Sequence, residues 1–253
     1  QFCKQGNING GVYLLNVKAL LNTKWPGKFA FEKDFLETQK FRLFGSVQDK
    51  YFIDIGIPED YCKAQAEFAK PVLNLKAIDK SWTIFIDRDG VINHEKKEDY
   101  IKSRDEFRFY DGIKEAFQVL NKKFGKIVVV SNQRGVGREL MTETDLHNIH
   151  QYMTKEIVTA GGRIDKIYYC TSTDNKHPNR KPNPGMAFLA KADYPGIDLN
   201  KSIMIGNKLS DMRFGRNAGI YTIFVATTNP DTAFPHIDID NRFGSLPDFV
   251  KAL

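Results

Sequence analysis

Cysteine is scarce in this sequence, and its three residues (Cys3, Cys62 and Cys170) lie too far apart to form a disulfide framework. This excludes the small disulfide-stapled secreted class and predicts a protein of the reducing cytoplasm. No apolar run approaches the roughly 18 residues of a membrane helix, and no secretory leader is apparent at the start. We therefore predict a cytoplasmic protein with no membrane partner. Because the chain opens on Gln1, we also expect it to be a fragment of a longer protein.

Dense basic runs, repeats and low-complexity tracts are absent as well. The net charge of +6 divides evenly, +3 in residues 1–80 and +3 in residues 81–253. A nucleic-acid-binding protein more often concentrates such charge on one element. The charge therefore predicts no nucleic-acid partner, and it suits small anionic substrates equally well.

Apolar residues make up 42% of the chain, enough for a packed core, and from Trp82 onward strand-like and helix-like segments alternate. This alternation predicts an α/β fold with a Rossmann-like parallel sheet covered on both faces. The expected strands are 83–87, 126–131, 164–170, 202–206 and 222–226; the expected helices are 112–124, 142–160 (capped by Thr142), 185–192, 209–218 and 246–253.

Residues 1–75 have a different pattern and predict a small α+β segment before a domain at 76–253. The expected strands are Val12–Leu15 and Tyr51–Ile55, and the expected helices are Phe31–Leu36 and Glu59–Lys70. We place the boundary near Pro71–Ser81.

Asp87 and Asp89 follow the apolar run Thr83–Ile86 directly and precede Gly90. A buried parallel strand would bring both carboxylates to its carboxyl end, where open α/β sheets bind ligands. Two acids there can bind Mg²⁺, attack phosphorus and move protons. The alternative is an ordinary acidic turn or a calcium loop, but a calcium loop needs a preceding helix and a glutamate near its twelfth position.

Three weaker signals follow later strands. Ser131-Asn132-Gln133 could hold phosphate oxygens or form a common turn, and Arg180-Lys181 could be a functional or a solvated cation pair. Asp211, after the glycine turn at Gly206, could serve a metal or the helix dipole.

In this order the motifs resemble the haloacid dehalogenase superfamily of phosphotransferases, and most closely its branch of histidinol-phosphate and heptose-bisphosphate phosphatases. That branch carries Asp-Arg-Asp-Gly-Val-Ile-Asn, Ser/Thr-Asn-Gln-x-Gly, Arg-Lys-Pro-x-Pro-Gly-Met and Gly-Asp-Lys-x-x-Asp-Met. The matching stretches are 87–93, 131–135, 180–186 and 206–212. The resemblance covers about residues 82–226. The spacing predicts that this phosphatase domain is capless, since only short loops separate Asp89 from Tyr110 and Ser131 from Thr142.

The resemblance implies a role for each matching position. Asp87 would be the nucleophile that forms an aspartyl-phosphate, and Asp89 the general acid and base. Ser131 and Lys181 would hold the transferring phosphoryl group and offset its charge. The implied substrate contacts are Asn132, Gln133, Arg180 and Lys208, and the implied Mg²⁺ site comprises Asp87, Asp89, Asn207 and Asp211.

Two positions depart from the branch. Asn207 stands where the family has Asp, so we expect weaker Mg²⁺ binding, and low activity or none remains open. Relatives often carry a four-ligand zinc loop before Arg-Lys-Pro, whereas the matching residues here are Cys170, Ser172, His177 and Asn179. Two ligands cannot close a structural zinc site, so we expect no zinc.

Residues 1–70 resemble the second half of sugar-1-phosphate nucleotidyltransferases, in which Asn9 and Glu32 would touch sugar and Asp54 would hold Mg²⁺. The glycine-rich nucleotide loop of those enzymes is absent from this sequence. We expect an inactive partial transferase or docking appendage, whose missing half would be a candidate partner.

The sequence thus predicts a Mg²⁺-dependent phosphatase of a sugar bisphosphate, D-glycero-D-manno-heptose 1,7-bisphosphate, in the synthesis of nucleotide-activated sugars. The alternatives are a histidinol-phosphate phosphatase, more distantly a polynucleotide 3′-phosphatase, and a weakly active or non-catalytic sugar-phosphate-binding scaffold. A homo-oligomer is compatible with each.

Overall fold

The computed structural model describes residues 13–16, 18, 21, 27–37, 44–47, 53–68 and 72–253. The chain divides into two compact units, Gln1–Tyr61 and Cys62–Leu253. The division falls within helix α2 (Pro58–Phe68), upstream of the boundary that the sequence suggests. The proposed division at residues 75 and 76 therefore stays a prediction.

The first unit contains the expected helical segment at Phe31–Leu36, which is a π-helix. The expected strands at Val12–Leu15 and Tyr51–Ile55 are wrong for the residues described there, 13–15 and 53–55, which form no strand. Around Asp54 the reason is local, because its carboxylate accepts a hydrogen bond from the Gly56 amide (2.9 Å) and closes a turn. Asn9 lies outside the described residues, so the transferase resemblance stays a prediction.

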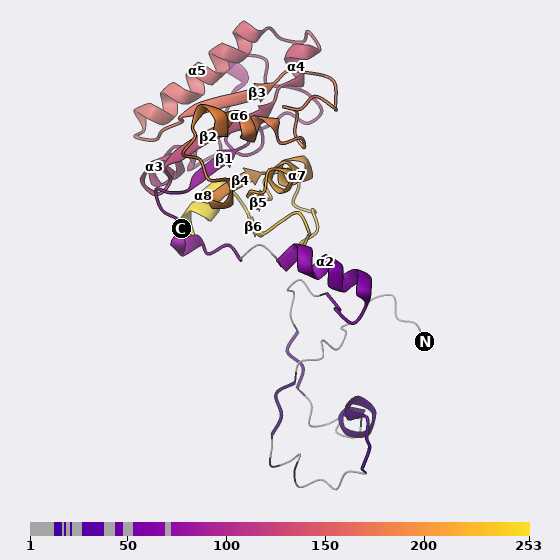
Figure 1. Ribbon diagram of the computed structural model, residues 1–253. Coiled ribbons are helices and arrows are strands. Elements are labelled where there is room, and N and C mark those ends of the chain that lie inside the picture. Colours follow the sequence, from indigo (N-terminus) through magenta and orange to yellow (C-terminus); the bar gives the residue numbers. More distant parts are fainter. Residues whose placement is uncertain are drawn as a thin grey trace. The chain divides into compact units, whose positions relative to one another are not determined.

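The second unit is built on a six-stranded sheet in the order β3-β2-β1-β4-β5-β6, with every strand parallel to its neighbours. The expected α/β fold with a Rossmann-like parallel sheet is confirmed (Figure 1). The strands are β1 (Thr83–Ile86), β2 (Lys126–Asn132), β3 (Lys166–Cys170), β4 (Ser202–Gly206), β5 (Tyr221–Val225) and β6 (Asn241–Phe243).

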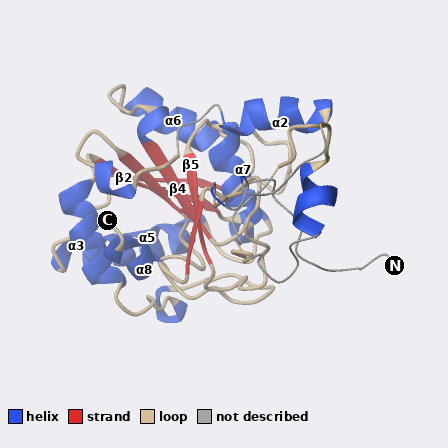
Figure 2. Ribbon diagram, turned by 90° about the horizontal axis from the view of Figure 1, so that it is seen from below, coloured by secondary structure: helices blue, strands red, loops and turns tan. Residues whose placement is uncertain are grey.

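Helices cover both faces of this sheet, as Figure 2 shows. One face packs on α3 (Ile113–Lys123), α5 (Glu143–Thr159) and α8 (Leu246–Lys251); the other packs on α6 (Gly185–Asp193) and α7 (Leu209–Asn217). Strands buried on both sides are continuously apolar, as in β1, whose four residues are all buried. Thr142 caps α5 as expected, in a capping box with Asp145.

The connections after β1 and β2 are short. Residues 87–112 contain only the 3₁₀ turn η4 (Arg104–Glu106), and α4 (Arg134–Gly137) is the only helix between β2 and α5; in this fully described part of the chain there is no cap domain. The remaining 3₁₀ turns are η3 (Leu75–Ala77) and η5 (Leu199–Lys201). Among the helices that the structure describes, none has the length and apolar character needed to cross a membrane.

Candidate active site

Asp87 and Asp89 lie in the turn that follows β1, beside the central strands of the sheet. The Arg88 carbonyl closes this turn by accepting hydrogen bonds from the amides of Val91 (3.3 Å), Ile92 (2.9 Å) and Asn93 (3.2 Å). Gly90 has a φ of 84°, and a Cβ there would collide with the Asn207 amide. The glycine thus allows the β1 turn and the β4 turn to meet.

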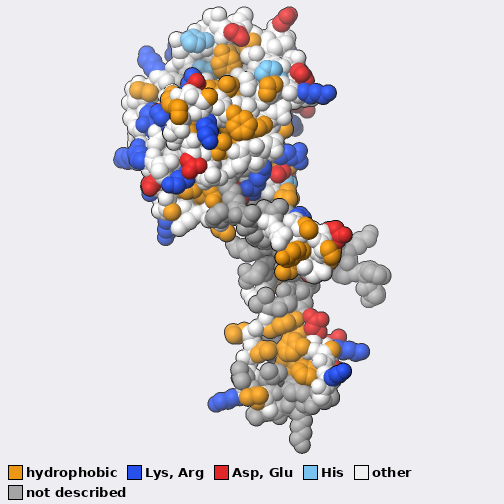
Figure 3. All heavy atoms as spheres, viewed as in Figure 1, with side chains coloured by type: hydrophobic (Ala, Val, Ile, Leu, Met, Phe, Trp, Pro, Cys, Tyr) orange, Lys and Arg blue, Asp and Glu red, His pale blue; other side chains and the backbone are white. Residues whose placement is uncertain are grey.

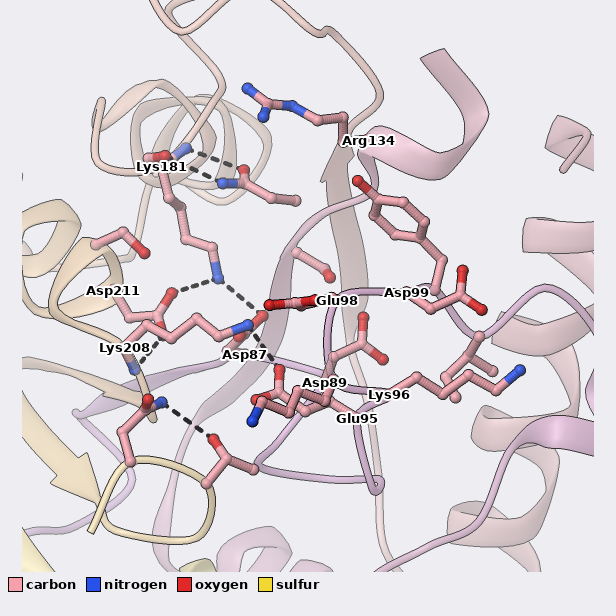
Figure 4. A pocket seen from close by; sticks show the side chains of 18 of the residues that line it. Asp87, Asp89, Glu95, Lys96, Glu98, Asp99, Arg134, Lys181, Lys208 and Asp211 are labelled. Carbon is pink, nitrogen blue, oxygen red and sulfur yellow. Dashed lines mark hydrogen bonds and ion pairs between the residues drawn. The ribbon is translucent and has the colours of Figure 1, made fainter. Parts of the chain in front are cut away.

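A buried lysine joins two carboxylates at the centre of the site. Lys181 Nζ lies 2.8 Å from Asp87 Oδ1 and 2.7 Å from Asp211 Oδ1, and it also donates to the Val130 carbonyl (2.9 Å) (Figure 4). The structure therefore brings together three residues that the sequence predicts at the ends of different strands. Burial alone would lower the pKa of Lys181, but Asp211 and Asp87 outweigh it and raise that pKa, so the lysine is a permanent cation.

The protonation of Asp87 is finely balanced. Burial raises its pKa to about 7, with Lys181 opposing the rise and Asp211 adding to it. A carboxylate nucleophile must be ionised. A further cation beside Asp87 would favour the ionised form.

Asp89 is held by several donors. Arg88 donates to both of its oxygens (2.9 Å from Nη2 to each), and Asn93 and Gln133 each donate once (2.9 Å). Burial would raise the pKa of Asp89, but Arg88 and these hydrogen bonds outweigh burial and lower it. The Gln133 amide also donates to Ser131 Oγ (2.7 Å), which links the ends of β1 and β2.

The other predicted substrate contacts have different surroundings. The Asn132 side chain bonds the backbone of Lys181 twice, accepting from its amide and donating to its carbonyl (3.0 Å each), so it fixes the position of that lysine. Lys208 pairs with Glu95 (2.6 Å), an acid at the cavity edge that sequence reasoning missed. Arg180 also lines the cavity.

Asn207 is buried at the end of β4 and has the features of a cation ligand. Its Nδ2 donates to Thr228 Oγ1 (2.6 Å), and its Oδ1 is buried without a hydrogen-bond partner. Buried polar atoms are rarely left unsatisfied. A carboxamide oxygen is an acceptable ligand for Mg²⁺, so the site fits Mg²⁺ held by Asp87, the Asp89 carbonyl and Asn207.

A cavity of about 850 Å³ opens above these groups, and three arginines that line it, Arg134, Arg138 and Arg180, pair with no carboxylate of the described residues. Burial lowers the pKa of Arg180, and Arg134 and Arg138 lower it further, so the cluster is short of negative charge. Arg134 and Arg138 were missed from the sequence, although Arg134 lies within the motif at 131–135 and Arg138 follows three residues after it.

Cys170 and His177 match two of the four zinc ligands that relatives carry in this loop. The two side chains are in contact, with Cys170 Sγ 3.5 Å from His177 Nδ1. His177 Nδ1 also accepts from the Asn179 amide (3.2 Å). The absence of zinc stays a prediction.

An aspartate pair at the end of a central strand of a parallel sheet, with a buried lysine shared by Asp87 and Asp211 at the edge of a cavity, defines a phosphomonoesterase of the haloacid dehalogenase type. The model of the family described as polynucleotide kinase 3 phosphatase matches residues 83–234, and the chain belongs to this family.

Curated relatives point to a narrower group. The chain is 38% identical over 146 residues (58% of this chain, 83% of the relative) to the D-glycero-alpha-D-manno-heptose-1,7-bisphosphate 7-phosphatase of Campylobacter jejuni. It is 35% identical over 183 residues (67% and 93%) to the corresponding beta-heptose enzyme of Escherichia coli. The solved D,D-heptose 1,7-bisphosphate phosphatase of B. bronchiseptica, complexed with magnesium and phosphate, superposes with a TM-score of 0.62 at 27% identity, covering 67% of this chain and 96% of that one.

Asn207→Asp is expected to bind Mg²⁺ about tenfold more tightly. A unit charge pair at 4 Å is worth ~4 kcal/mol at an effective dielectric of about 20, and the added cost of desolvating the carboxylate offsets part of this. Without Mg²⁺ the variant should be less stable than wild type, because the new carboxylate replaces an amide that lies 3.4 Å from Glu95. Calorimetric titration and the Mg²⁺-dependent shift in Tm measure both effects. Asn200→Asp, which adds the same charge at an exposed position of η5, is the control. Equal Mg²⁺ affinity of wild type and Asn207→Asp would show that Asn207 does not weaken metal binding.

Stability should fall as the pH drops from 7 to 5, in part because of His150 on α5. Burial and the neighbouring Arg88 lower the pKa of His150 to about 3, so only the unfolded chain takes up a proton in this window. Against an unfolded pKa of about 6.5, this contributes about 2 kcal/mol of lost stability between pH 7 and 5. Urea unfolding of wild type and His150→Gln at both pH values measures it, and identical pH dependence would contradict the assignment.

Proposed function

We propose that this chain hydrolyses one phosphate ester of a sugar bisphosphate, with D-glycero-D-manno-heptose 1,7-bisphosphate as substrate, the 7-phosphoryl group transferred and the sugar oxygen as leaving group. The observation that carries the proposal is one cavity that Asp87 lines together with three arginines, none of which pairs with a carboxylate of the described residues. Figure 4 shows Arg134 across the cavity from Lys208 and Glu95. The named activities of the relatives support the same substrate class.

In this proposal Asp87 attacks the phosphorus and forms an aspartyl-phosphate. Asp89 enters this step protonated, against the donors that lower its pKa, and gives its proton to the departing sugar oxygen. Asp89 then takes a proton from the water that hydrolyses the intermediate. Lys181 and Ser131 stabilise charge on the phosphoryl oxygens. Mg²⁺, when bound, supplies further positive charge at the transferring group.

The arginine cluster distinguishes the candidate substrates, in a cavity that Glu95, Glu98 and Asp99 also line. Histidinol phosphate carries an ammonium group, which the arginine cluster would repel, whereas a second phosphate would be attracted. A polynucleotide would need basic side chains gathered on one face. Figure 3 shows the basic side chains scattered over the visible face of the larger unit, with acidic ones between them.

The test is kcat/KM for a panel of heptose 1,7-bisphosphate anomers, fructose 1,6-bisphosphate, histidinol phosphate and a 3′-phosphorylated oligonucleotide. We expect a heptose bisphosphate to be preferred. Preference for histidinol phosphate or the oligonucleotide would overturn the proposed substrate. Binding of the bisphosphate without turnover would indicate that the chain is a non-catalytic sugar-phosphate-binding scaffold.

Arg134→Gln is expected to raise KM for the bisphosphate roughly 10- to 100-fold, the value of one charge-assisted hydrogen bond, with KM for the matching sugar 7-monophosphate unchanged. Arg213→Gln, on the surface of α7, is the control, since its side chain is 58% exposed. Equal increases in KM for both substrates would show that Arg134 does not bind the second phosphate.

A further inference from the structure

Arg88, between the two aspartates, is completely buried, with 0% of its side chain exposed. A buried cation is costly unless it is paired and hydrogen-bonded. Arg88 meets this requirement with Nε, which donates to Asp89 Oδ1 (3.1 Å), and with Nη2, which donates to Asp89 Oδ2 (2.9 Å). Two parallel donors of a planar guanidinium fix the orientation of a carboxylate as well as its position.

The opposite end of the guanidinium faces His150. Arg88 Nη1 lies 3.1 Å from His150 Nε2, and His150 is only 6% exposed. The imidazole is neutral because burial and Arg88 lower its pKa to about 3. Its Nε2 can therefore accept the hydrogen bond from Arg88, with the ring proton on Nδ1.

Each contact thus constrains the next one, from α5 through Arg88 to the β1 turn. The buried His150 ring holds one end of the guanidinium, and the other end holds both oxygens of Asp89. General acid catalysis requires the acid within hydrogen-bond reach of the leaving oxygen, so small displacements are costly. We infer that His150 is a positioning residue, which acts through Arg88 to aim Asp89 at the leaving group.

This inference rests on the proposed mechanism, in which Asp89 protonates a sugar alkoxide. A sugar oxygen is a poor leaving group and needs that proton, whereas 4-nitrophenolate leaves without it. A misplaced Asp89 should therefore slow phosphate transfer from alkyl phosphates while sparing 4-nitrophenyl phosphate. A merely structural role for His150 would slow both substrates alike.

The test compares His150→Phe, which keeps a ring but no acceptor, with His150→Gln, whose carbonyl can still accept from Arg88. First-turnover rates are measured by rapid quench on heptose bisphosphate, on glycerol 2-phosphate and on 4-nitrophenyl phosphate, so that hydrolysis of the intermediate does not mask the first step. His147→Phe, exposed on the same helix, is the control.

For His150→Phe we expect a loss of about 10- to 100-fold on both alkyl phosphates, less than about threefold on 4-nitrophenyl phosphate, and an unchanged KM. His150→Gln should recover most of the loss. Equal losses on all three substrates, or no loss on any, would overturn the inference. If wild type turns over the other two substrates but not heptose bisphosphate, the proposed substrate is wrong. The rates on glycerol 2-phosphate would then still test the role of His150.

Discussion

Asp87→Asn is expected to release no phosphate above background, a loss of roughly 10⁴- to 10⁶-fold in kcat, as for removal of other covalent nucleophiles. The amide cannot form an acyl phosphate, although its oxygen can still accept from Lys181 and from the Arg88 amide, as Asp87 Oδ1 does now (2.8 Å each). The variant should therefore fold normally. Phosphate release from heptose bisphosphate, measured beside circular dichroism, separates lost chemistry from lost structure.

Binding of the unreacted bisphosphate by Asp87→Asn is the control, because the arginines and Lys181 are unchanged. Residual turnover within about tenfold of wild type would contradict a nucleophilic role for Asp87. It would favour direct attack by water instead, with Asp87 acting only through its charge.

Lys181→Met is expected to impair both catalysis and stability. The transferring phosphoryl group loses a preorganised cation, which is worth about 10²- to 10³-fold in kcat. The fold loses the group that separates two nearly buried carboxylates, with side chains 9% (Asp87) and 2% (Asp211) exposed. Breaking such a buried pair costs about 3–5 kcal/mol.

The pH dependence of this loss identifies its cause. The pKa of Asp87 is already raised to about 7 in wild type, and removal of Lys181 raises it further. Its protonated form therefore relieves the repulsion at low pH, and the penalty grows as the pH rises through 7. Urea unfolding of the Mg²⁺-free protein should show that Lys181→Met loses more free energy of unfolding at pH 8 than at pH 6. Lys208 is half exposed, so Lys208→Met should lose little free energy of unfolding at either pH. A pH-independent loss would contradict the shared-lysine arrangement.

The sheet could be predicted from the sequence because parallel strands buried on both faces are short, continuous apolar runs between turns. β4 (Ser202–Gly206) has the predicted bounds, and most other elements differ by one or two residues. β6 was missed because its three half-buried residues, Asn241–Phe243, carry no apolar run. In the first unit, local turn chemistry at Asp54 overrode a strand-like pattern.

The central site could also be predicted, since carboxyl ends of adjacent parallel strands meet at one edge of the sheet. Asp87, Lys181 and Asp211 lie together for this reason. Helix packing and loop conformation decide which other side chains reach the cavity. The sequence therefore could not assign four residues to the site: Glu95, Arg134, Arg138 and His150. Asn132 illustrates the same limit, since its motif suggests substrate binding and its observed partner is the Lys181 backbone.

In the proposed mechanism Asp87 becomes phosphorylated by a sugar bisphosphate. The most direct measurement uses heptose 1,7-bisphosphate labelled with ³²P at the 7-phosphate, acid quench after the first turnover, and peptide mapping. We expect label on the peptide that contains Asp87, and conversion of that residue to homoserine by borohydride. Release of labelled phosphate with no labelled protein at any quench time, or label on another residue, would contradict it.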